Sequence, residues 1–378
     1  MTRRNLQVLA VATVVLLGAG IWLSSHRSRE QADLGGGVVF PDLKSALGDV
    51  SEIRLSRGDG SKTTLRKNAT GWVVAERNFP ADPQRVRELA LALADLKIIE
   101  RKTSDPANYP KLGVEDIKPG TAGTLVEVVT PKKTWDLIAG KAAEGRAIYI
   151  RQPKDAASAL AEPSLGVDPD QKRWVDRLLT DVPSADIHDI SVNPSAGPPY
   201  LLTRAQRGDA DLTLGAVPRG RKAAGNFALN GQADSLIAFN FDDLRTAPAT
   251  APAAADHATY RTFDGQVIEF TGHKDADKAF ISVAASRDAA LAAQFPAPKP
   301  AAPAPASAPT PKAAGNTVER LNARAQGLEF EIPLYKYEGI FKPLEDLLEK
   351  LPEPAKPAAK TKASPAPDKQ NPFKKKQP

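Results

Sequence analysis

The sequence predicts an α+β fold, with an N-terminal transmembrane helix followed by two similar meander-plus-helix units that contain antiparallel sheets. Three observations support this prediction. Short segments alternate between apolar and polar residues and are separated by Gly, Asn and Asp, as is typical of strands joined by tight turns. Segments with apolar residues at helical spacing follow some of these strands. One strand pattern recurs in the second half of the chain, which indicates an internal repeat.

The predicted transmembrane helix is the stretch 5–23, which contains no charged residue. A helix of this length, rising about 1.5 Å per residue, spans roughly 27 Å, close to the thickness of a hydrocarbon core. Arg3 and Arg4 precede it, and Trp22 stands where an interfacial aromatic anchor is expected. We therefore expect an uncleaved signal anchor. The expected membrane span includes Leu6, Val11, Leu16, Ile21 and Trp22.

The anchor also predicts where the rest of the chain lies. A short basic N-terminus before a single span usually stays cytoplasmic, so we expect a single-pass inner-membrane protein with the bulk of the chain in the periplasm. The alternative is cleavage near Gly18–Gly20, which would release a soluble periplasmic protein. The chain has no Cys, which excludes disulfides, thiolate zinc sites and a lipidated cysteine.

The first unit, 41–163, is predicted to be a meander with one packed helix. Asp82 followed by Pro83 predicts the N-cap and first turn of that helix. Val86, Leu89 and further apolar residues then recur at helical spacing. Strands are expected at 49–55, 63–67, 72–75, 98–99, 124–130, 134–138 and 146–151.

The second unit, 164–286, is predicted to repeat the first. Asp186–Val192 matches Asp49–Leu55 in residue type at every position, and at the same spacing Leu202 corresponds to Leu65. Helices are expected at 172–179 and 234–244, and strands at 186–192, 260–263, 266–271 and 279–283.

An Ala/Pro linker interrupts the chain after the second unit. Beyond it, Leu328–Pro333 alternates as a strand that we expect to return to the second sheet, and a helix is expected over 335–351. The expected organisation is a cytoplasmic N-terminus (1–4), a transmembrane anchor (5–23), a flexible tether (24–40), two α+β repeats (41–163 and 164–286), the linker (287–316), a C-terminal strand and helix (317–351) and a disordered Lys/Pro/Ala tail (352–378).

The formal charge of +6 arises at the two ends of the chain. The tail is rich in Lys, whereas the body between the ends is slightly acidic, which argues against nucleic-acid binding by the folded part. Lys374, Lys375 and Lys376, beside Phe373, form a candidate tail for anionic surfaces. The alternative interpretation is a solubilising disordered end.

Motifs for chemistry are absent from the sequence. It contains no phosphate-binding loop, dinucleotide fingerprint, nucleophile elbow or zinc-protease motif, and its four His residues stand far apart. We therefore expect no catalytic residue, no cofactor and no metal. Asp168 and Asp170 are interpreted as solvated caps, Arg57–Asp59 as a hairpin turn and Trp174 as a core residue.

An aromatic and basic cluster near the C-terminus is a candidate partner surface. It consists of Tyr335, Lys336, Tyr337 and Phe341. A strand-to-helix junction packed on a core explains the same cluster equally well.

Several segments together resemble a known family. These segments are Val50–Leu55, Gly71–Val74, Leu96–Ile99, Leu112–Val114, Gly140–Lys141, Tyr149–Arg151 and Leu165–Val167. With the N-terminal span, they make the chain similar to the bacterial envelope proteins grouped as domain of unknown function 4340. The resemblance covers about residues 40–285, and its motifs are structural.

The resemblance implies a single-pass envelope protein of a kind often encoded beside ABC transporter components. We therefore expect a membrane-anchored periplasmic binding or adaptor subunit that is accessory to an ABC-type envelope transport system, with an unknown ligand. One alternative is an envelope scaffold that contacts the cell wall or anionic lipid. The other is a periplasmic hydrolase whose site is assembled from residues that the sequence does not connect.

Overall fold

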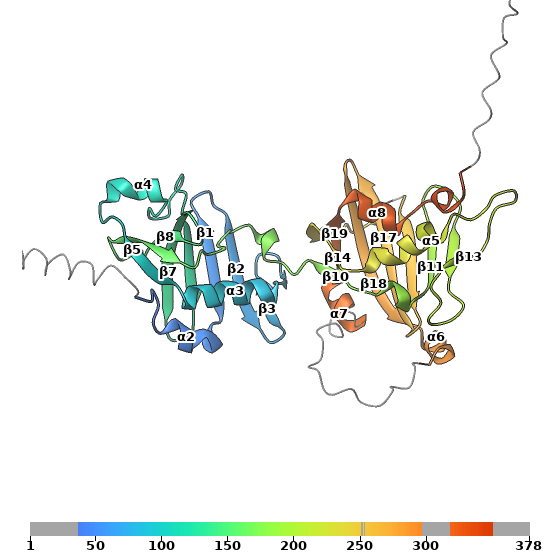
Figure 1. Cartoon of the computed structure of the whole chain (residues 1–378), viewed down its shortest axis with the longest axis horizontal. Coiled ribbons are helices and arrows are strands. Elements are labelled where there is room, and N and C mark those ends of the chain that lie inside the picture. The colour runs from blue at the N-terminus through green and yellow to red at the C-terminus, as the bar shows by residue number, and fades with distance from the viewer. Residues whose placement is uncertain (1–36, 251, 253, 297–317, 351–378) are drawn as a thin grey trace, which may run out of the picture.

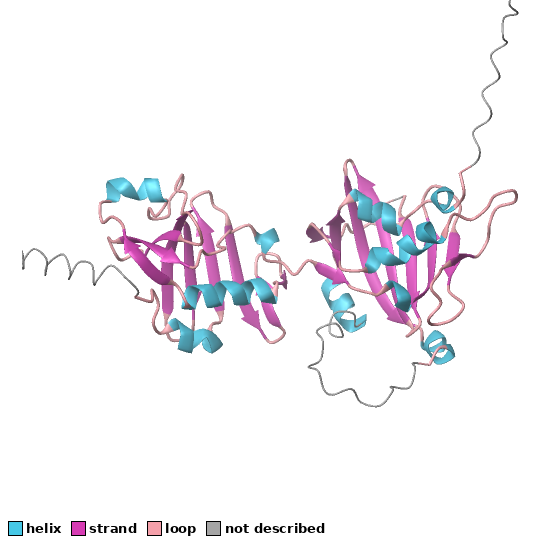
Figure 2. Cartoon of the chain, in the orientation of Figure 1, coloured by secondary structure: helices cyan, strands magenta, loops and turns pink. Residues whose placement is uncertain are grey.

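The structure is a computed structural model that describes residues 37–250, 252, 254–296 and 318–350. Two large antiparallel sheets, one of nine and one of eight strands, dominate it, and helices pack beside each sheet (Figure 1). Figure 2 shows the helices and strands mixed along both halves of the chain. The predicted α+β class with antiparallel sheets is confirmed.

The nine-stranded sheet occupies the first half of the chain and has the order β4-β3-β2-β1-β6-β7-β8-β9-β5. Its strands are β1 (Glu52–Arg57), β2 (Lys62–Asn68), β3 (Gly71–Val74), β4 (Phe79–Pro80), β5 (Lys97–Arg101), β6 (Thr124–Val129), β7 (Thr134–Ala142), β8 (Ile148–Arg151) and β9 (Ser158–Glu162). All strands predicted for this half are present within a few residues. β4 and β9 were not predicted.

Three α-helices accompany this sheet: α2 (Leu43–Ala46), α3 (Pro83–Ala94) and α4 (Tyr109–Leu112). The prediction for α3 is confirmed in detail. The Asp82 carboxylate accepts hydrogen bonds from the N–H groups of Gln84 and Arg85, at 2.9 and 3.2 Å. These bonds satisfy donors that the first helical turn leaves free, so the helix starts at Pro83. Its buried face includes Val86 and Leu89.

The eight-stranded sheet occupies the second half and has the order β13-β12-β11-β16-β17-β18-β19-β15. Its strands are β11 (Ile187–Asn193), β12 (Tyr200–Thr203), β13 (Thr213–Leu214), β15 (Asp243–Thr246), β16 (Asp256–Thr262), β17 (Gln266–Asp275), β18 (Lys278–Arg287) and β19 (Leu328–Ile332). β19 pairs with β15 and β18. The predicted return of this strand to the second sheet is therefore confirmed.

The strand order of the second sheet matches that of the first. Each of its eight strands has a counterpart of the same rank in the run β3-β2-β1-β6-β7-β8-β9-β5. The pairing agrees residue by residue at the centre, because Ile53 pairs with Leu65 and Ile190 pairs with Leu202. These two leucines are the ones that the sequence pattern placed in correspondence.

The predicted helix at 172–179 is wrong. The structure has a single 3-10 turn at Gln171–Arg173, then extended chain and β10 (Leu178–Thr180), which pairs with β14 (Phe239–Asn240). The backbone N–H of Asp176 donates to the carbonyl of Pro80 at 2.9 Å. Pairing with another segment therefore replaces the intrahelical bonds that the apolar spacing suggested.

The predicted helix at 234–244 is also wrong in position. Helix α5 spans Asn226–Ala233 and continues only as a 3-10 turn at Asp234–Leu236. Ala238 has a φ of 45°, a left-handed conformation that ends helical structure. The rest of the predicted segment forms β14 and β15, because β15 pairs with β19.

The remaining helices are α6 (Ala289–Gln294), α7 (Val318–Ala325) and α8 (Leu334–Ile340). The helix expected over 335–351 is shorter than predicted and is followed by a 3-10 turn at Leu344–Leu347. Pro343 explains its end, since a proline disfavours helical geometry in the residue before it.

No helix among the described residues is long and apolar enough to cross a membrane. The predicted span 5–23 lies outside the described residues, as do most of the Ala/Pro linker and the tail 352–378. α6 occupies the start of the expected linker.

Candidate functional site

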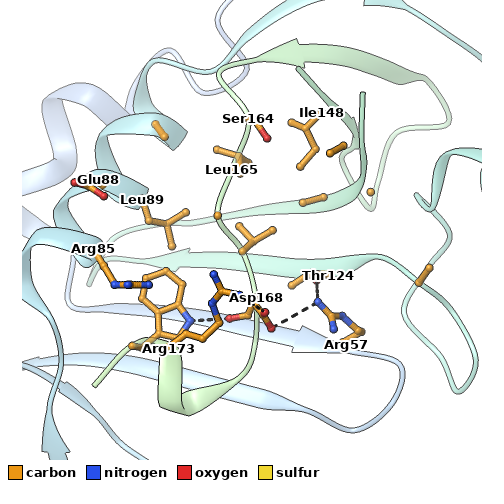
Figure 3. Close-up of a pocket in the computed structure, with 18 residues that line it drawn as sticks. Arg57, Arg85, Glu88, Leu89, Thr124, Ile148, Ser164, Leu165, Asp168 and Arg173 are labelled. Atoms are coloured by element: carbon orange, nitrogen blue, oxygen red, sulfur yellow. Dashed lines mark hydrogen bonds and ion pairs between the residues drawn. The ribbon is translucent and has the colours of Figure 1, made fainter. Parts of the chain in front are cut away.

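A cavity of about 520 Å³ lies in the first half, between α3, strands of the nine-stranded sheet and the segment 164–174 (Figure 3). Residues from distant parts of the sequence line it. They are Arg57, Arg85, Glu88, Leu89, Ala92, Ala122, Thr124, Ala139, Gly140, Ala142, Ile148, Ser164, Leu165, Gly166, Val167, Asp168, Arg173 and Trp174. The volume is within the range typical of small-molecule sites.

One side of the cavity is apolar. Leu89 of α3, Ile148 of β8 and Leu165 are buried side chains that project toward the same space (Figure 3). Small residues, among them Ala92 and Ala139, complete this side. Because small side chains fill less volume than the leucines beside them, they leave room for a ligand.

The opposite side carries charge. Figure 3 shows Arg85, Arg173, Asp168 and Arg57 along it. The Asp168 carboxylate accepts a hydrogen bond from Arg173 at 3.3 Å and lies 3.9 Å from the Arg57 guanidinium. Three guanidinium groups and the two carboxylates of Glu88 and Asp168 face the cavity, which leaves an excess of positive charge.

The segment 168–174 is a rigid turn rather than a loose loop. Asp168 accepts a hydrogen bond from the Asp170 N–H, and Asp170 accepts one from the Lys172 N–H, each at 3.1 Å. The buried Trp174 donates its indole N–H to the Asp168 carbonyl at 2.7 Å. The interpretation as a cap is confirmed for Asp170, which caps the 3-10 turn Gln171–Arg173, whereas Asp168 is ion-paired with Arg57 and Arg173. Trp174 both packs in the core and lines the cavity.

Arg57 makes only long contacts with its polar neighbours. Its guanidinium donates to the Thr124 hydroxyl at 3.4 Å and lies 4.0 Å from Asp59. Its buried Nε has no hydrogen-bond partner in the part of the chain that the structure describes. The two Nη groups make one long hydrogen bond and two long ion pairs, which leaves them able to donate to a closer acceptor.

A close backbone approach shapes the cavity edge. A Cβ on Gly140 would lie 2.3 Å from the Leu112 carbonyl oxygen, so only glycine allows the chain after α4 to lie against β7. Gly113, with a φ of 71°, ends α4 at the same place. The Leu112–Val114 and Gly140–Lys141 motifs are thus two halves of one contact.

The C-terminal aromatic cluster is mostly internal. Tyr337 and Phe341 are buried, with ring centroids 4.6 Å apart. Lys336 donates to the Asn240 carbonyl at 2.7 Å and lies over the Phe239 ring, and burial lowers its pKa. Tyr335 remains 70 % exposed.

The other residues selected from the sequence lie outside the described residues. These are Leu6, Val11, Leu16, Ile21 and Trp22 of the expected span and Lys374, Lys375 and Lys376 of the tail. Within the described ranges, no group of three or more His, Asp or Glu side chains could hold a metal ion.

Sequence reasoning missed a buried ionic cluster in the second sheet. His188 lies 2.5 Å from the carboxylate of Asp189, which is 1 % exposed. Arg261 donates to the same carboxylate at 2.8 Å, and Phe263 packs edge-on against His188. The alternating pattern of β11 would have suggested an outward Asp189. The two partners satisfy the buried carboxylate of Asp189, and we interpret the cluster as part of the packing of the sheet.

The fold and the cavity define a two-sheet α+β protein with a small-molecule-sized cavity in its first half. A family model described as domain of unknown function (DUF4340) matches residues 72–261, about half of the chain. The chain belongs to this family. The matched region begins at β3, ends in β16 and includes α3 and the segment 164–174. Comparison with curated proteins and with solved structures gives no match.

Proposed function

We propose that this protein is a membrane-anchored periplasmic binding or adaptor subunit, accessory to an ABC-type envelope transport system. The cavity beside α3 supports the binding role. The uncharged stretch 5–23 supports the anchor in the inner membrane. The link to ABC transporters rests on what the family resemblance implies.

The residues that line the cavity favour a binding role over catalysis. A general acid and base need two groups that converge on one reacting atom with separated pKa values. Asp168 is instead paired with Arg173, and Glu88 is an exposed residue of α3. We therefore rank the hydrolase alternative below a binding function.

We also infer that the folded part consists of two similar units behind a single transmembrane helix. The shared order of eight strands supports this inference, as does the equivalent pairing of Ile53 with Leu65 and Ile190 with Leu202. The first of these units carries the cavity.

Affinity purification of the full chain from detergent-solubilised membranes tests this function. We expect ABC transporter subunits to be recovered with the tagged protein and to be absent from an untagged control. Recovery with cell-wall fragments, without transporter subunits, would contradict the adaptor role and favour the scaffold. N-terminal sequencing of the purified protein tests the anchor. A mature N-terminus at Ile21 or beyond would show that the segment is cleaved and would contradict the anchor.

A further inference from the structure

We propose that the cavity beside α3 binds an anionic amphiphile, a molecule with an apolar chain and one carboxylate or phosphate head. This inference rests on the proposed role of the cavity as a binding site. It adds the chemical class of the ligand, which the two unlike sides of the cavity define (Figure 3).

The apolar side selects the chain of the ligand. Leu89, Ile148 and Leu165 present buried aliphatic surface to a space of about 520 Å³. A flexible hydrocarbon chain gains free energy in proportion to the apolar area that it removes from water. A wholly polar ligand would leave this surface unused.

The charged side selects the head. The Nη groups of Arg57 donate to the Thr124 hydroxyl at 3.4 Å and lie 3.9 and 4.0 Å from the nearest carboxylates, beyond hydrogen-bond distance. Arg85 is an exposed residue of α3 whose ion pair is with the helix cap Asp82 at 3.3 Å. Both guanidinium groups therefore keep donors for an incoming carboxylate or phosphate.

The sign of the head follows from the carboxylates already present. Asp168 is shared by Arg57 and Arg173, so its negative charge is compensated. The exposed Glu88 is the other carboxylate of the lining, whereas Asp82 and Asp59, which pair with Arg85 and Arg57, are not among the lining residues. Among the residues that line the cavity, three arginines therefore face two carboxylates, which favours an anionic head over an ammonium head.

Isothermal titration calorimetry with the full chain in phosphatidylcholine nanodiscs tests the inference, with empty nanodiscs subtracted. The probes are octyl phosphate, octanoate, 1-octanol, octylammonium and inorganic phosphate. We expect octyl phosphate and octanoate to bind at least about tenfold more tightly than the other three, since a hydrogen bond to a charged group typically contributes this much or more.

Two variants and a matched control locate the site. Arg57→Gln and Arg85→Gln should each weaken octyl phosphate binding by about tenfold. Arg87→Gln is the control, because Arg87 is an exposed arginine on the same helix and does not line the cavity. It should bind as the unmodified chain does.

The outcomes separate this inference from the proposed function. Equal binding of octanol or octylammonium would overturn the ligand class but leave the cavity as a binding site. If none of the probes binds, both the proposed ligand class and the role of the cavity as a binding site are overturned. An equal loss of affinity in Arg87→Gln and Arg85→Gln would show that the ligand does not bind in the cavity beside α3. Inorganic phosphate binding as tightly as octyl phosphate would show that the site recognises the head alone, and would also overturn the inference.

Discussion

Phe79 of β4 packs edge-on against Phe241 of the second half, with ring centroids 5.6 Å apart and an interplanar angle of 89°. Phe330 of β19 lies 6.1 Å from the same ring, and the Arg324 guanidinium lies over it at 5.2 Å. Because Phe79 is fully buried, the edge strand of the first sheet is anchored in the second half. Most buried hydrophobic residues of the two halves belong to one continuous cluster, and Tyr109, Val114 and Ile138 form a small separate one.

Removal of the Phe79 ring should therefore destabilise the whole body. We expect Phe79→Ala to lower the free energy of unfolding by about 3–5 kcal/mol, as large-to-small core substitutions do. Urea unfolding followed by tryptophan fluorescence measures it. Phe227→Ala is the control, since Phe227 is 95 % exposed and should change stability by no more than about 0.5 kcal/mol. An unchanged midpoint in Phe79→Ala would contradict the anchoring role.

Two glycines in the second half should respond to alanine with opposite signs. A Cβ on Gly272 would lie 2.3 Å from the Phe341 ring, so Gly272→Ala should destabilise the protein by about 1–3 kcal/mol. Gly231 lies within α5 and has open space around it, so Gly231→Ala should stabilise the protein by about 0.5–1 kcal/mol. Thermal unfolding compares the two variants. An unchanged or raised melting temperature in Gly272→Ala would contradict the close packing of Gly272 against Phe341, and a lowered one in Gly231→Ala would contradict the open space around Gly231.

Arg151 should not tolerate lysine. Its buried guanidinium donates to the Val114 carbonyl at 2.8 Å and to the Asp155 carbonyl at 3.1 Å, and it lies over the Tyr109 ring. Lysine cannot donate to several carbonyls in this fixed geometry. We therefore expect Arg151→Lys to lower the free energy of unfolding by about 1.5–3 kcal/mol. Faster hydrogen exchange in 109–117 should accompany the loss. The exposed Arg146→Lys is the control, and equal effects in both variants would refute the role of Arg151.

The ionised Asp256 carboxylate should contribute to the stability of the fold, and acid should remove this contribution. Burial raises the pKa of this carboxyl. Hydrogen bonds from Tyr337 at 2.6 Å and from Ser195 lower the pKa by more than burial raises it, so the net pKa lies below its usual value. Since the unfolded pKa is about 3.9, this stabilisation is present above about pH 4 and is lost as the pH falls through the folded pKa.

The test compares the unmodified chain with Asp256→Asn between pH 7 and pH 3. The unmodified chain should be the more stable at neutral pH, and the difference in unfolding free energy should shrink below about pH 4. A difference that stays constant over the whole range would rule out the lowered pKa.

Local signals in the sequence were sufficient for much of the fold. The cap at Asp82 predicted α3 because the capping bonds lie within three residues. Alternation predicted the main strands, and the match of Asp49–Leu55 to Asp186–Val192 anticipated two sheets with the same central pairing. The helices predicted at 172–179 and 234–244 failed because extended pairing with distant segments replaced local hydrogen bonds there.

The cavity could not be predicted from the sequence. Its charged side joins Arg57, Arg85 and Asp168, which come from β1, α3 and an extended segment after β9. No spacing relates such residues before the sheet is formed. Trp174 was assigned to the core correctly, but only the folded chain shows that its indole also borders a cavity.

Photo-crosslinking in living cells tests the proposed adaptor role, because it records protein contacts in the intact envelope. A photoreactive phenylalanine analogue replaces Tyr335 or, separately, Phe227, two exposed aromatic positions of the second half. We expect a crosslinked product that contains a subunit of an ABC-type transporter, identified by mass spectrometry. Normal accumulation of both variants in the membrane, with no crosslink to any transporter subunit, would contradict it.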